Sequence, residues 1–351
     1  VSTPDGLKKA IQQNNSANIK LVADIDISNL GTICDTFKGH IYGKYQYTNK
    51  VGELRDTVYS LKGGGKEIPR IFNKLDHANI EYIMLDDFTV KGKGDVVGAL
   101  AGTASYTNFN YMMTNKVVVS SKDDNVGGLV GNADHCRFEG VSINYSSVRS
   151  DETIVGGMVG ESHQCTFSNC VTNRSTVFAD GALASNYARV GGLSGYSVGD
   201  TFTNCVNTSV VGGNEDSVGG FAGRSDGSTF MGCTNSGVII HANESDFNQV
   251  VENVKKMYED QSTLSEAVIQ TAFLFGLFGG AGLAAGHIIC LASIGAGFLP
   301  IFGAFCGAIL VAAGIATYVA WLTTLHDEIG GICGQANSSE FSLCLNSGFI
   351  N

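Results

Sequence analysis

Proline and positive charge are scarce in this sequence. Only three of its 351 residues are proline and only 22 are lysine or arginine, against 33 acidic residues, so the formal net charge is −11. With so little proline beside its 46 glycines, and with no three-residue period, the chain cannot form a collagen triple helix. Because it has no basic stripe to meet phosphate, we expect no nucleic-acid partner. The apolar share of 44 % is too high for a disordered chain.

Two motifs of common enzyme sites are also missing. The sequence contains no phosphate-binding loop of the Walker type and no His-Glu-x-x-His zinc helix. We therefore expect a protein that is not an enzyme and that carries no cofactor.

Glycine, in contrast, is abundant and recurs in a fixed pattern. A motif with valine first and glycine at its second and sixth positions has start-to-start spacings of 29, 29, 35 and 28 residues, beginning at Val97, Val126, Val155, Val190 and Val218. Twelve positions after each valine stands a phenylalanine: Phe109, Phe138, Phe167, Phe202 and Phe230. A period in this range indicates a solenoid. Since the repeats show strand-like alternation and no helical period, we predict a parallel β-helix with coils about 4.8 Å apart.

These repeats resemble the GLUG-motif repeats of bacterial and protist surface proteins. The likeness is carried by Val126-Gly127-Gly128-Leu129-Val130-Gly131 and its four counterparts, and it extends upstream to segments such as 37–43 and 80–85. The polar segment 44–56 interrupts the pattern. The resemblance covers residues 1 to about 240 and implies a β-helical scaffold at a cell surface, without implying any particular activity.

The chain divides into four parts on this basis. Residues 1–95 would hold an N-terminal cap and the first coils, and residues 96–240 the repeats, for about 7–8 rungs in all. Residues 246–328 would form an amphipathic helix and a hydrophobic helical hairpin, and residues 329–351 a tail containing cysteines. In the cap, we expect Asp5 to begin a short helix that shields the first rung.

The hairpin prediction rests on residues 267–325, which lack a charged side chain over 59 positions. This length suffices for two membrane spans. Small residues four apart would let the two helices approach closely: Gly276, Gly280, Gly282, Gly286, Gly303 and Gly307. Two interpretations stay open. The segment either inserts in a membrane or is buried between copies of the chain.

Cysteines fall into columns of the predicted coils. Cys136 and Cys165 share an offset of ten from their valines, and three others share an offset of fifteen, namely Cys170, Cys205 and Cys233. Stacked Cα atoms lie within disulfide range. We therefore predict a Cys136–Cys165 bridge and one bridge in the second column, Cys205–Cys233 or Cys170–Cys205. In the tail, we expect Cys333 to pair with Cys344.

Two alternatives to these bridges stay open. Buried cysteines can act as small apolar fillers of the interior. A zinc site could instead combine Cys136 and Cys165 with His135 and His163.

Acidic residues precede the glycine motif and give weak candidates for calcium ligands: Asp95, Asp124 and Glu152. The alternative is a solvated acidic edge. Six Asn-x-Ser/Thr sequons are candidate glycosylation sites: Asn14, Asn144, Asn173, Asn207, Asn243 and Asn337. For Asn173 and Asn207 an inward asparagine ladder is the alternative.

Together these features predict a secreted or cell-surface structural or adhesive protein. Its β-helix would be displayed or polymerised through residues 267–325, with a membrane or further copies of the chain as partner, and its long face would meet a glycan or protein ligand. The main alternative is a pore-forming or membrane-disrupting effector that uses the glycine-rich hairpin. The third is a calcium-dependent carbohydrate-active enzyme.

Overall fold

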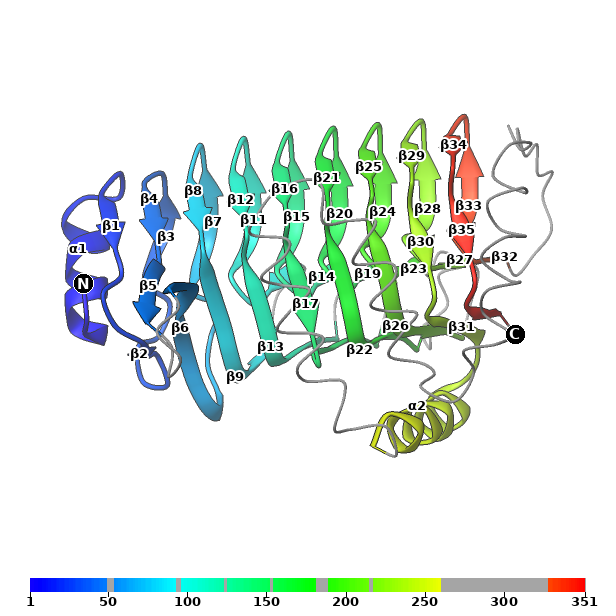
Figure 1. Cartoon of the computed structure of the whole chain (residues 1–351), viewed down its shortest axis with the longest axis horizontal. Coiled ribbons are helices and arrows are strands. Elements are labelled where there is room, and N and C mark those ends of the chain that lie inside the picture. Colours follow the sequence, from blue (N-terminus) through cyan, green and yellow to red (C-terminus); the bar gives the residue numbers. More distant parts are fainter. Residues whose placement is uncertain are drawn as a thin grey trace.

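The computed structural model describes residues 1–48, 54–92, 96–122, 125–151, 154–180, 189–214, 217–259 and 328–350. Within them the protein is mainly β, and its short strands stack coil upon coil in parallel sheets, as in a parallel β-helix (Figure 1). Two helices accompany the described strands. Helix α1 (Pro4–Gln13) covers one end of the stack, and α2 (Glu244–Glu259) lies against its side near the other end.

Each complete coil passes through four sheets, which we number in chain order. Sheet I contains β10 (Val97–Gly98), β14 (Val126–Gly127), β19 (Ile154–Gly156), β23 (Arg189–Gly191), β27 (Ser217–Gly219) and β32 (Glu328–Gly330). Sheet II contains β3 (Cys34–Phe37), β7 (Phe72–Asp76), β11 (Ala101–Ser105), β15 (Val130–Asp134), β20 (Val159–His163), β24 (Ser194–Val198), β28 (Ala222–Asp226) and β33 (Cys333–Asn337).

Sheet III contains β1 (Asn18–Lys20), β4 (His40–Tyr42), β8 (Asn79–Glu81), β12 (Asn108–Asn110), β16 (Arg137–Glu139), β21 (Thr166–Ser168), β25 (Thr201–Thr203), β29 (Thr229–Met231) and β34 (Glu340–Ser342). Sheet IV contains β2 (Ile25–Asp26), β6 (Leu54–Glu67), β9 (Ile83–Lys91), β13 (Met113–Ser121), β17 (Ser142–Asn144), β18 (Ser147–Ser150), β22 (Val171–Ala179), β26 (Val206–Gly213), β30 (Thr234–Asn235), β31 (Val238–His241), β35 (Leu345–Asn346) and β36 (Phe349–Ile350), with β5 (Lys44–Thr48) at its edge.

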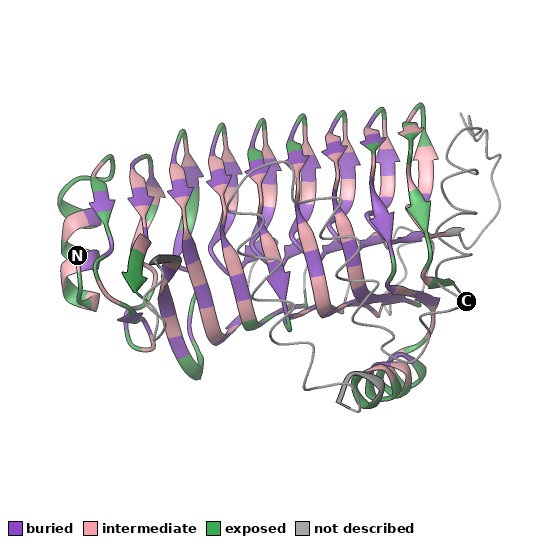
Figure 2. Ribbon diagram, viewed as in Figure 1, coloured by how far each residue is buried: buried purple, intermediate pink, exposed green. Residues whose placement is uncertain are grey.

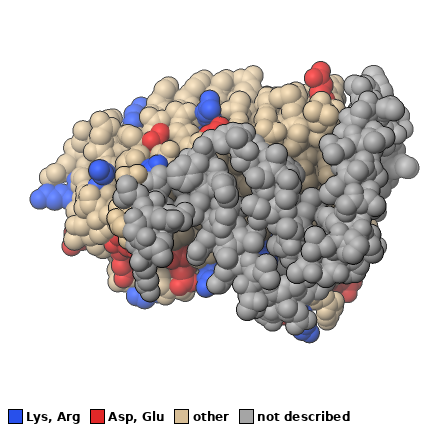
Figure 3. Space-filling view, viewed as in Figure 1, with Lys and Arg blue, Asp and Glu red and all other residues tan. Residues whose placement is uncertain are grey.

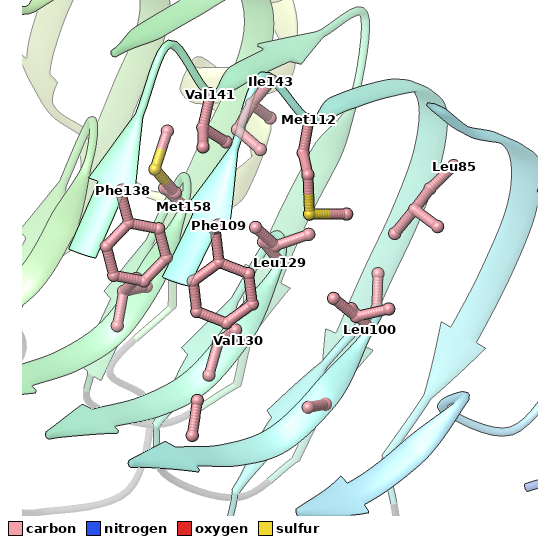
Figure 4. Close-up of a cluster of buried hydrophobic side chains, with 14 of the residues drawn as sticks. Leu85, Leu100, Phe109, Met112, Leu129, Val130, Phe138, Val141, Ile143 and Met158 are labelled. Atoms are coloured by element: carbon pink, nitrogen blue, oxygen red, sulfur yellow. The ribbon is translucent and has the colours of Figure 1, made fainter. Parts of the chain in front are cut away.

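Phenylalanine fills the interior behind sheet III. The central residue of each short strand points inward while its two neighbours are more exposed, so the predicted phenylalanines form one column (Figure 2). Neighbouring rings stack with centroids 4.6 to 4.9 Å apart from Phe109 to Phe341. Leucine, valine and methionine side chains surround them (Figure 4). The repeat register predicted from the sequence is therefore confirmed.

The paired glycines form corners between sheets I and II. A Cβ atom at Gly127 would lie 1.8 Å from the carbonyl oxygen of Val130, and one at Gly128 would lie 2.1 Å from that of Gly157 on the next coil. Any larger residue would push the coils apart. This close approach explains why the motif keeps glycine, as the sequence predicts.

The N-terminal helix confirms the expected cap but not its first residue. Thr3, rather than Asp5, is the N-cap, because its hydroxyl accepts a hydrogen bond of 3.2 Å from the Gly6 amide. Pro4 starts the helix, which leaves Asp5 in the first turn, where its charge favours the helix dipole. Leu7 and Ile11 are buried against the first coil.

The polar interruption at residues 44–56 is a local departure from the coil. Strand β5 pairs with the beginning of β6 in antiparallel register, from Lys44 opposite Val58 to Thr48 opposite Leu54. The chain then resumes the coil, since β6 also pairs with β9 in parallel.

Residues 328–350 form a further coil of the stack rather than a separate tail. Strands β32, β33, β34 and β35 pair in parallel with β27, β28, β29 and β30, and β36 pairs with β31. Among the described residues, sheet III thus has nine strands, the last of which follows the long segment after α2. The predicted hairpin, its turn and its six packing glycines lie outside the described residues.

Helix α2 packs on the outside of sheet IV. Its buried residues Phe247 and Val251 contact Phe178, Val210 and Ile240, and the rings of Phe178 and Phe247 lie 4.5 Å apart. Arg149 pairs with Glu244 at the start of the helix. The predicted amphipathic helix therefore begins at Glu244 and remains attached to the β-helix.

Candidate functional site

A column of left-handed residues marks the turn between sheets II and III. The φ angles are 54°, 49° and 50° at His77, Tyr106 and His135, the residues of the first three turns in this column. The same position holds Gln164, Gly199, Gly227 and Ser338 in later coils, again with positive φ. The column thus changes from aromatic rings to small or polar residues along the molecule.

The three rings stack on one another at the surface. Ring centroids are 4.9 Å apart between His77 and Tyr106 and 4.8 Å apart between Tyr106 and His135. Tyr106 is 50 % exposed. Carboxylates hold both imidazoles, with Nδ1 of His77 2.8 Å from Asp76 and Nδ1 of His135 2.9 Å from Asp134.

A second aromatic column lines the opposite edge of sheet III. Tyr82 and Tyr111 also have left-handed backbones, with φ of 55° and 52°, and their rings stack at 5.1 Å. Tyr42 meets Tyr82 edge-on at 5.5 Å, and the Lys44 ammonium lies 5.3 Å from the Tyr82 ring centroid. Burial raises the pKa of the Tyr82 hydroxyl.

Between the two columns, sheet III presents amide and carboxylate groups. The Asn108 amide donates to Asn79 at 2.7 Å, and the Asn110 amide donates to Glu81 at 2.8 Å. Glu81 also contacts Nε2 of His40 at 3.2 Å. We call this surface the aromatic face and define it by both columns and these residues: His77, Tyr106, His135, Tyr82, Tyr111, Asn79, Glu81, Asn108 and Asn110.

Charged groups along the aromatic face are paired with one another. Lys38 binds Asp76 at 2.8 Å, and Arg137 binds Glu139 at 3.3 Å. Hydrogen bonds from Lys38 and His77 lower the pKa of Asp76 to about 2. Acidic and basic side chains are sparse over much of the described surface visible in Figure 3.

The cysteines occupy the predicted columns but form no bridges among the described residues. Cys136, Cys165, Cys170, Cys205 and Cys233 are buried free thiols, and Cys34 and Cys344 are partly exposed free thiols. Stacked residues of a parallel sheet point their Cβ atoms in the same direction at a spacing of about 4.8 Å, whereas a disulfide needs about 3.5–4.5 Å. The predicted pairings are therefore not formed, and the apolar-filler alternative describes the buried five.

Cys333 and Cys344 do not pair because they belong to different sheet positions of the last coil. Cys333 begins β33 opposite Ala222, while Cys344 follows β34 and extends the column of Cys170, Cys205 and Cys233. The Cys344 thiol donates to the carbonyl oxygen of Phe230 at 3.4 Å.

The alternative zinc site does not assemble in the part of the chain that is described. There, no group of three or more His, Cys, Asp or Glu is placed to hold a metal ion. His135 is exposed while Cys136 is buried, so these adjacent side chains point to opposite sides of the coil. They therefore cannot bind the same zinc ion. The calcium candidates Asp95, Asp124 and Glu152 lie outside the described residues.

Two sequons are buried. Asn207 is fully buried in a ladder, where it accepts from Thr172 at 2.7 Å and donates to Asn235 at 2.7 Å, and Asn144 is 4 % exposed. These two positions cannot carry a glycan in the folded protein, and the ladder alternative for Asn207 is confirmed. Asn173 is half-buried and donates to Asn144 at 3.3 Å. The remaining three, Asn14, Asn243 and Asn337, are exposed.

A carboxylate is buried inside the coils at Asp200. Its oxygens accept hydrogen bonds from Ser162 at 2.5 Å, Ser197 at 2.6 Å and the Cys165 amide at 2.7 Å. Burial nevertheless raises the pKa of Asp200 to about 6. Sequence reasoning missed this residue, which stands at the same offset from its valine as Cys136 and Cys165.

Two stretches match the Gly-x-Ser-x-Gly pattern of hydrolase nucleophiles, around Ser197 and Ser225. Both serines are fully buried in strands β24 and β28 and point into the coil. Ser197 donates to Asp200, and Ser225 contacts the hydroxyl of Ser339 at 2.8 Å. They form part of the interior packing, out of reach of a substrate.

The fold and its surface ladders place the chain among proteins built from stacked parallel β coils. No protein-family model matches the sequence, and no curated protein matches it. The likeness to GLUG-motif repeats therefore stays a prediction.

Proposed function

We propose that this chain is a non-enzymatic structural or adhesive protein of the cell surface or secreted space. In this proposal the β-helix presents a binding surface, and residues 267–325 attach it to a membrane or to further copies of the chain. The glycine-motif repeats and their resemblance to GLUG repeats support a scaffold role.

The observation that carries the proposal is the route of the chain. It leaves the stack after His241 at the end of β31 and rejoins it at Glu328 at the start of β32. Those strands belong to consecutive coils, because β32 pairs with β27 and β36 pairs with β31. The described residues on either side of the uncharged segment thus belong to one body.

This route constrains how the segment could meet a bilayer. A segment that starts and finishes on the same side must cross a membrane an even number of times, and 59 uncharged residues suffice for two crossings of about 20 residues each. The route therefore supports the hairpin over one or three spans. Neither described helix is long and apolar enough to span a membrane.

Vesicle flotation tests the proposal. The full chain is compared with a variant in which a Gly/Ser linker replaces residues 261–326, so that α2 and the last coil remain. We expect the full chain to float with phosphatidylcholine vesicles, or to sediment as an assembly without them, and the variant to do neither. A full chain that stays monomeric and does not float would overturn the proposal.

Dye-loaded vesicles separate an anchor from the pore-forming alternative. An anchor leaves the vesicles sealed after binding. Dye release by the full chain, absent with the linker variant, would favour the membrane-disrupting effector instead.

A further inference from the structure

We propose that the aromatic face binds a neutral polysaccharide, whose chain runs along the β-helix axis over strands β4, β8, β12 and β16. The proposal deepens the adhesive role proposed above by naming the ligand class. Its site consists only of described residues in the first half of the chain, remote in sequence from residues 267–325.

The first argument is the backbone conformation of the aromatic columns. Left-handed φ is strained for bulky residues and free of that strain for glycine. Glycine holds the equivalent position at Gly199 and Gly227, with φ of 64° and 69°. Tyr106 and His135 thus carry rings at a turn position that glycine fills with less strain.

Ring stacking offsets part of this strain but leaves the outer edges of the rings in water. Tyr106 remains 50 % exposed although His77 and His135 cover its two faces. A half-exposed tyrosine that combines an apolar ring with a hydroxyl is suited to ligands that are both apolar and hydrogen-bonding. Sugar rings, with C–H faces and hydroxyl rims, have this character.

The second argument is the polar surface between the columns. Each side-chain amide carries two N–H donors and a carbonyl acceptor. The ladder uses one N–H of Asn108 toward Asn79 and one of Asn110 toward Glu81. The next coils replace these amides with charged and then hydroxyl side chains, at Arg137 and Thr166. The amide ladder is thus confined to the coils that bear the aromatic columns.

Charge pairing points to a neutral ligand. Asp76 and Glu139 each have a basic partner within 3.3 Å, Lys38 and Arg137 respectively, and Glu81 contacts the imidazole of His40 at 3.2 Å. An acidic polymer would have to compete with these carboxylates, while a basic polymer would have to displace their partners. Hydroxyl groups can bind the amides without disturbing either.

The length of the face limits the ligand. Four neighbouring strands, three steps of about 4.8 Å, span about 14 Å. A short oligosaccharide fits this distance, so tetrasaccharides are suitable probes. Beyond β16 the turn column loses its aromatic rings, from Gln164 onward.

Calorimetric titration of the full chain tests the proposal with neutral tetrasaccharides of glucose, xylose, mannose and N-acetylglucosamine, and with tetragalacturonate as the acidic comparator. We expect at least one neutral tetrasaccharide to bind in preference to tetragalacturonate. Tyr106→Gly and His135→Gly should each weaken binding about tenfold or more, as expected for loss of an aromatic anchor. Both variants keep the turn, because glycine holds it in later coils.

Tyr145→Gly is the matched control. Tyr145 is 38 % exposed and also has a left-handed φ of 48°, but it lies between β17 and β18 of sheet IV. Its replacement should leave affinity within about twofold. Circular dichroism verifies that each variant is folded, and Asn108→Ala provides a second probe of the face should a glycine variant unfold.

Several results would overturn the proposal: no neutral tetrasaccharide binding at millimolar concentration, preferential binding of tetragalacturonate, or equal weakening by Tyr145→Gly. These outcomes are distinguishable from failure of the proposed function, because flotation and sedimentation depend on residues 267–325 and are measured without sugar.

Discussion

Asn235 donates a 2.7 Å hydrogen bond to the side chain of Asn346, a residue 111 positions further along the chain. The same ladder continues to Asn207 and Thr172, with hydrogen bonds of 2.7 Å at each step. Asn235 Oδ1 also accepts from the Gly237 amide at 3.2 Å. The ladder therefore joins the last coil to the body of the β-helix and holds a backbone bend at the same time.

Replacing Asn235 by alanine should destabilise the last coil. It would leave buried polar groups of Asn207 and Gly237 without their partner, at a cost of about 1–3 kcal/mol. Chemical denaturation measures the loss, and hydrogen exchange should rise first in residues 328–350. Asn15→Ala, on the exposed turn after α1, is the control and should change stability by less than about 0.5 kcal/mol. Equal effects of the two substitutions would contradict the ladder's role.

The loss of stability on truncating a phenylalanine of the interior column should depend on the position of that residue in the stack. Phe167 is fully buried between Phe138 and Phe202, so Phe167→Ala should cost about 3–5 kcal/mol. Phe341 stacks on Phe230 in the last coil and is only partly buried, so Phe341→Ala should cost less. Thermal unfolding gives the comparison. The prediction fails if Phe341→Ala is the more destabilising change.

Asp200 should make folding less favourable as pH rises. Its pKa is about 6 in the folded protein against 3.8 for an ordinary aspartate, so the native state binds more protons than the unfolded state between those values. The stabilising contribution of the neutral form is thus lost from pH 4 to above 6, by roughly 3 kcal/mol. The difference in unfolding free energy between Asp200→Asn and the parent protein isolates this effect, because other carboxylates titrate in both.

We expect that difference to move in favour of Asp200→Asn with increasing pH. A difference that stays constant from pH 4 to 7 would show that Asp200 does not titrate in this range. Asp134→Asn, which changes a half-exposed carboxylate beside His135, serves as the comparison variant.

Thiol labelling should separate two groups of cysteines. In the native protein, iodoacetamide should modify the partly exposed Cys34 and Cys344 ahead of Cys136, Cys165, Cys170, Cys205 and Cys233, which are buried. Both should react slowly at pH 8 because little thiolate is present: burial raises the pKa of the Cys34 thiol to about 11, and the hydrogen bond with Cys233 together with burial raises the pKa of the Cys344 thiol well above its usual range. Mass spectrometry after labelling reads each site, with denatured protein as the reference for full reaction. Recovery of a Cys136–Cys165 linked peptide without reduction would contradict the free thiols.

The sequence predicts the coils well because residues close together within each repeat determine the register of the coils. Glycine at Gly127 and Gly128 allows close backbone approach, and phenylalanine twelve positions after each valine fills the interior. The same offsets also predict which cysteines share a column. The offsets do not predict whether these cysteines form disulfide bonds, because a disulfide depends on the direction of the Cβ atoms as well as on the spacing of the coils.

The last coil escaped prediction for a different reason. Ile329-Gly330-Gly331-Ile332-Cys333-Gly334 repeats the glycine motif with isoleucine in place of valine, and Phe341 follows at the usual twelve positions. Its start lies 111 residues after Val218, however, so a search for periods of 28 to 35 residues does not reach it. Motif matching without a fixed period would have found it.

The aromatic face was missed because its residues vary along each column. Nine positions after the motif valine stand Tyr106, His135 and Gln164, followed by Gly199 and Gly227. This mixture carries no repeat signal of its own. These residues can be recognised as one column only when the structure shows that this turn residue has a left-handed backbone conformation, which glycine adopts without strain.

The interrupted route of the chain also sets an order of events during synthesis. Strands β27 to β31 leave the ribosome before the 86 residues from 242 to 327, and the last coil emerges only after them. Until then, the edges of those strands have no partner from residues 328–350. Closing so long a loop costs only slightly more entropy than closing a short one, since the cost grows with the logarithm of length. The finished stack can therefore act as a template for its final coil. That coil is added late, after the uncharged segment has been synthesised and has reached its proposed binding partner.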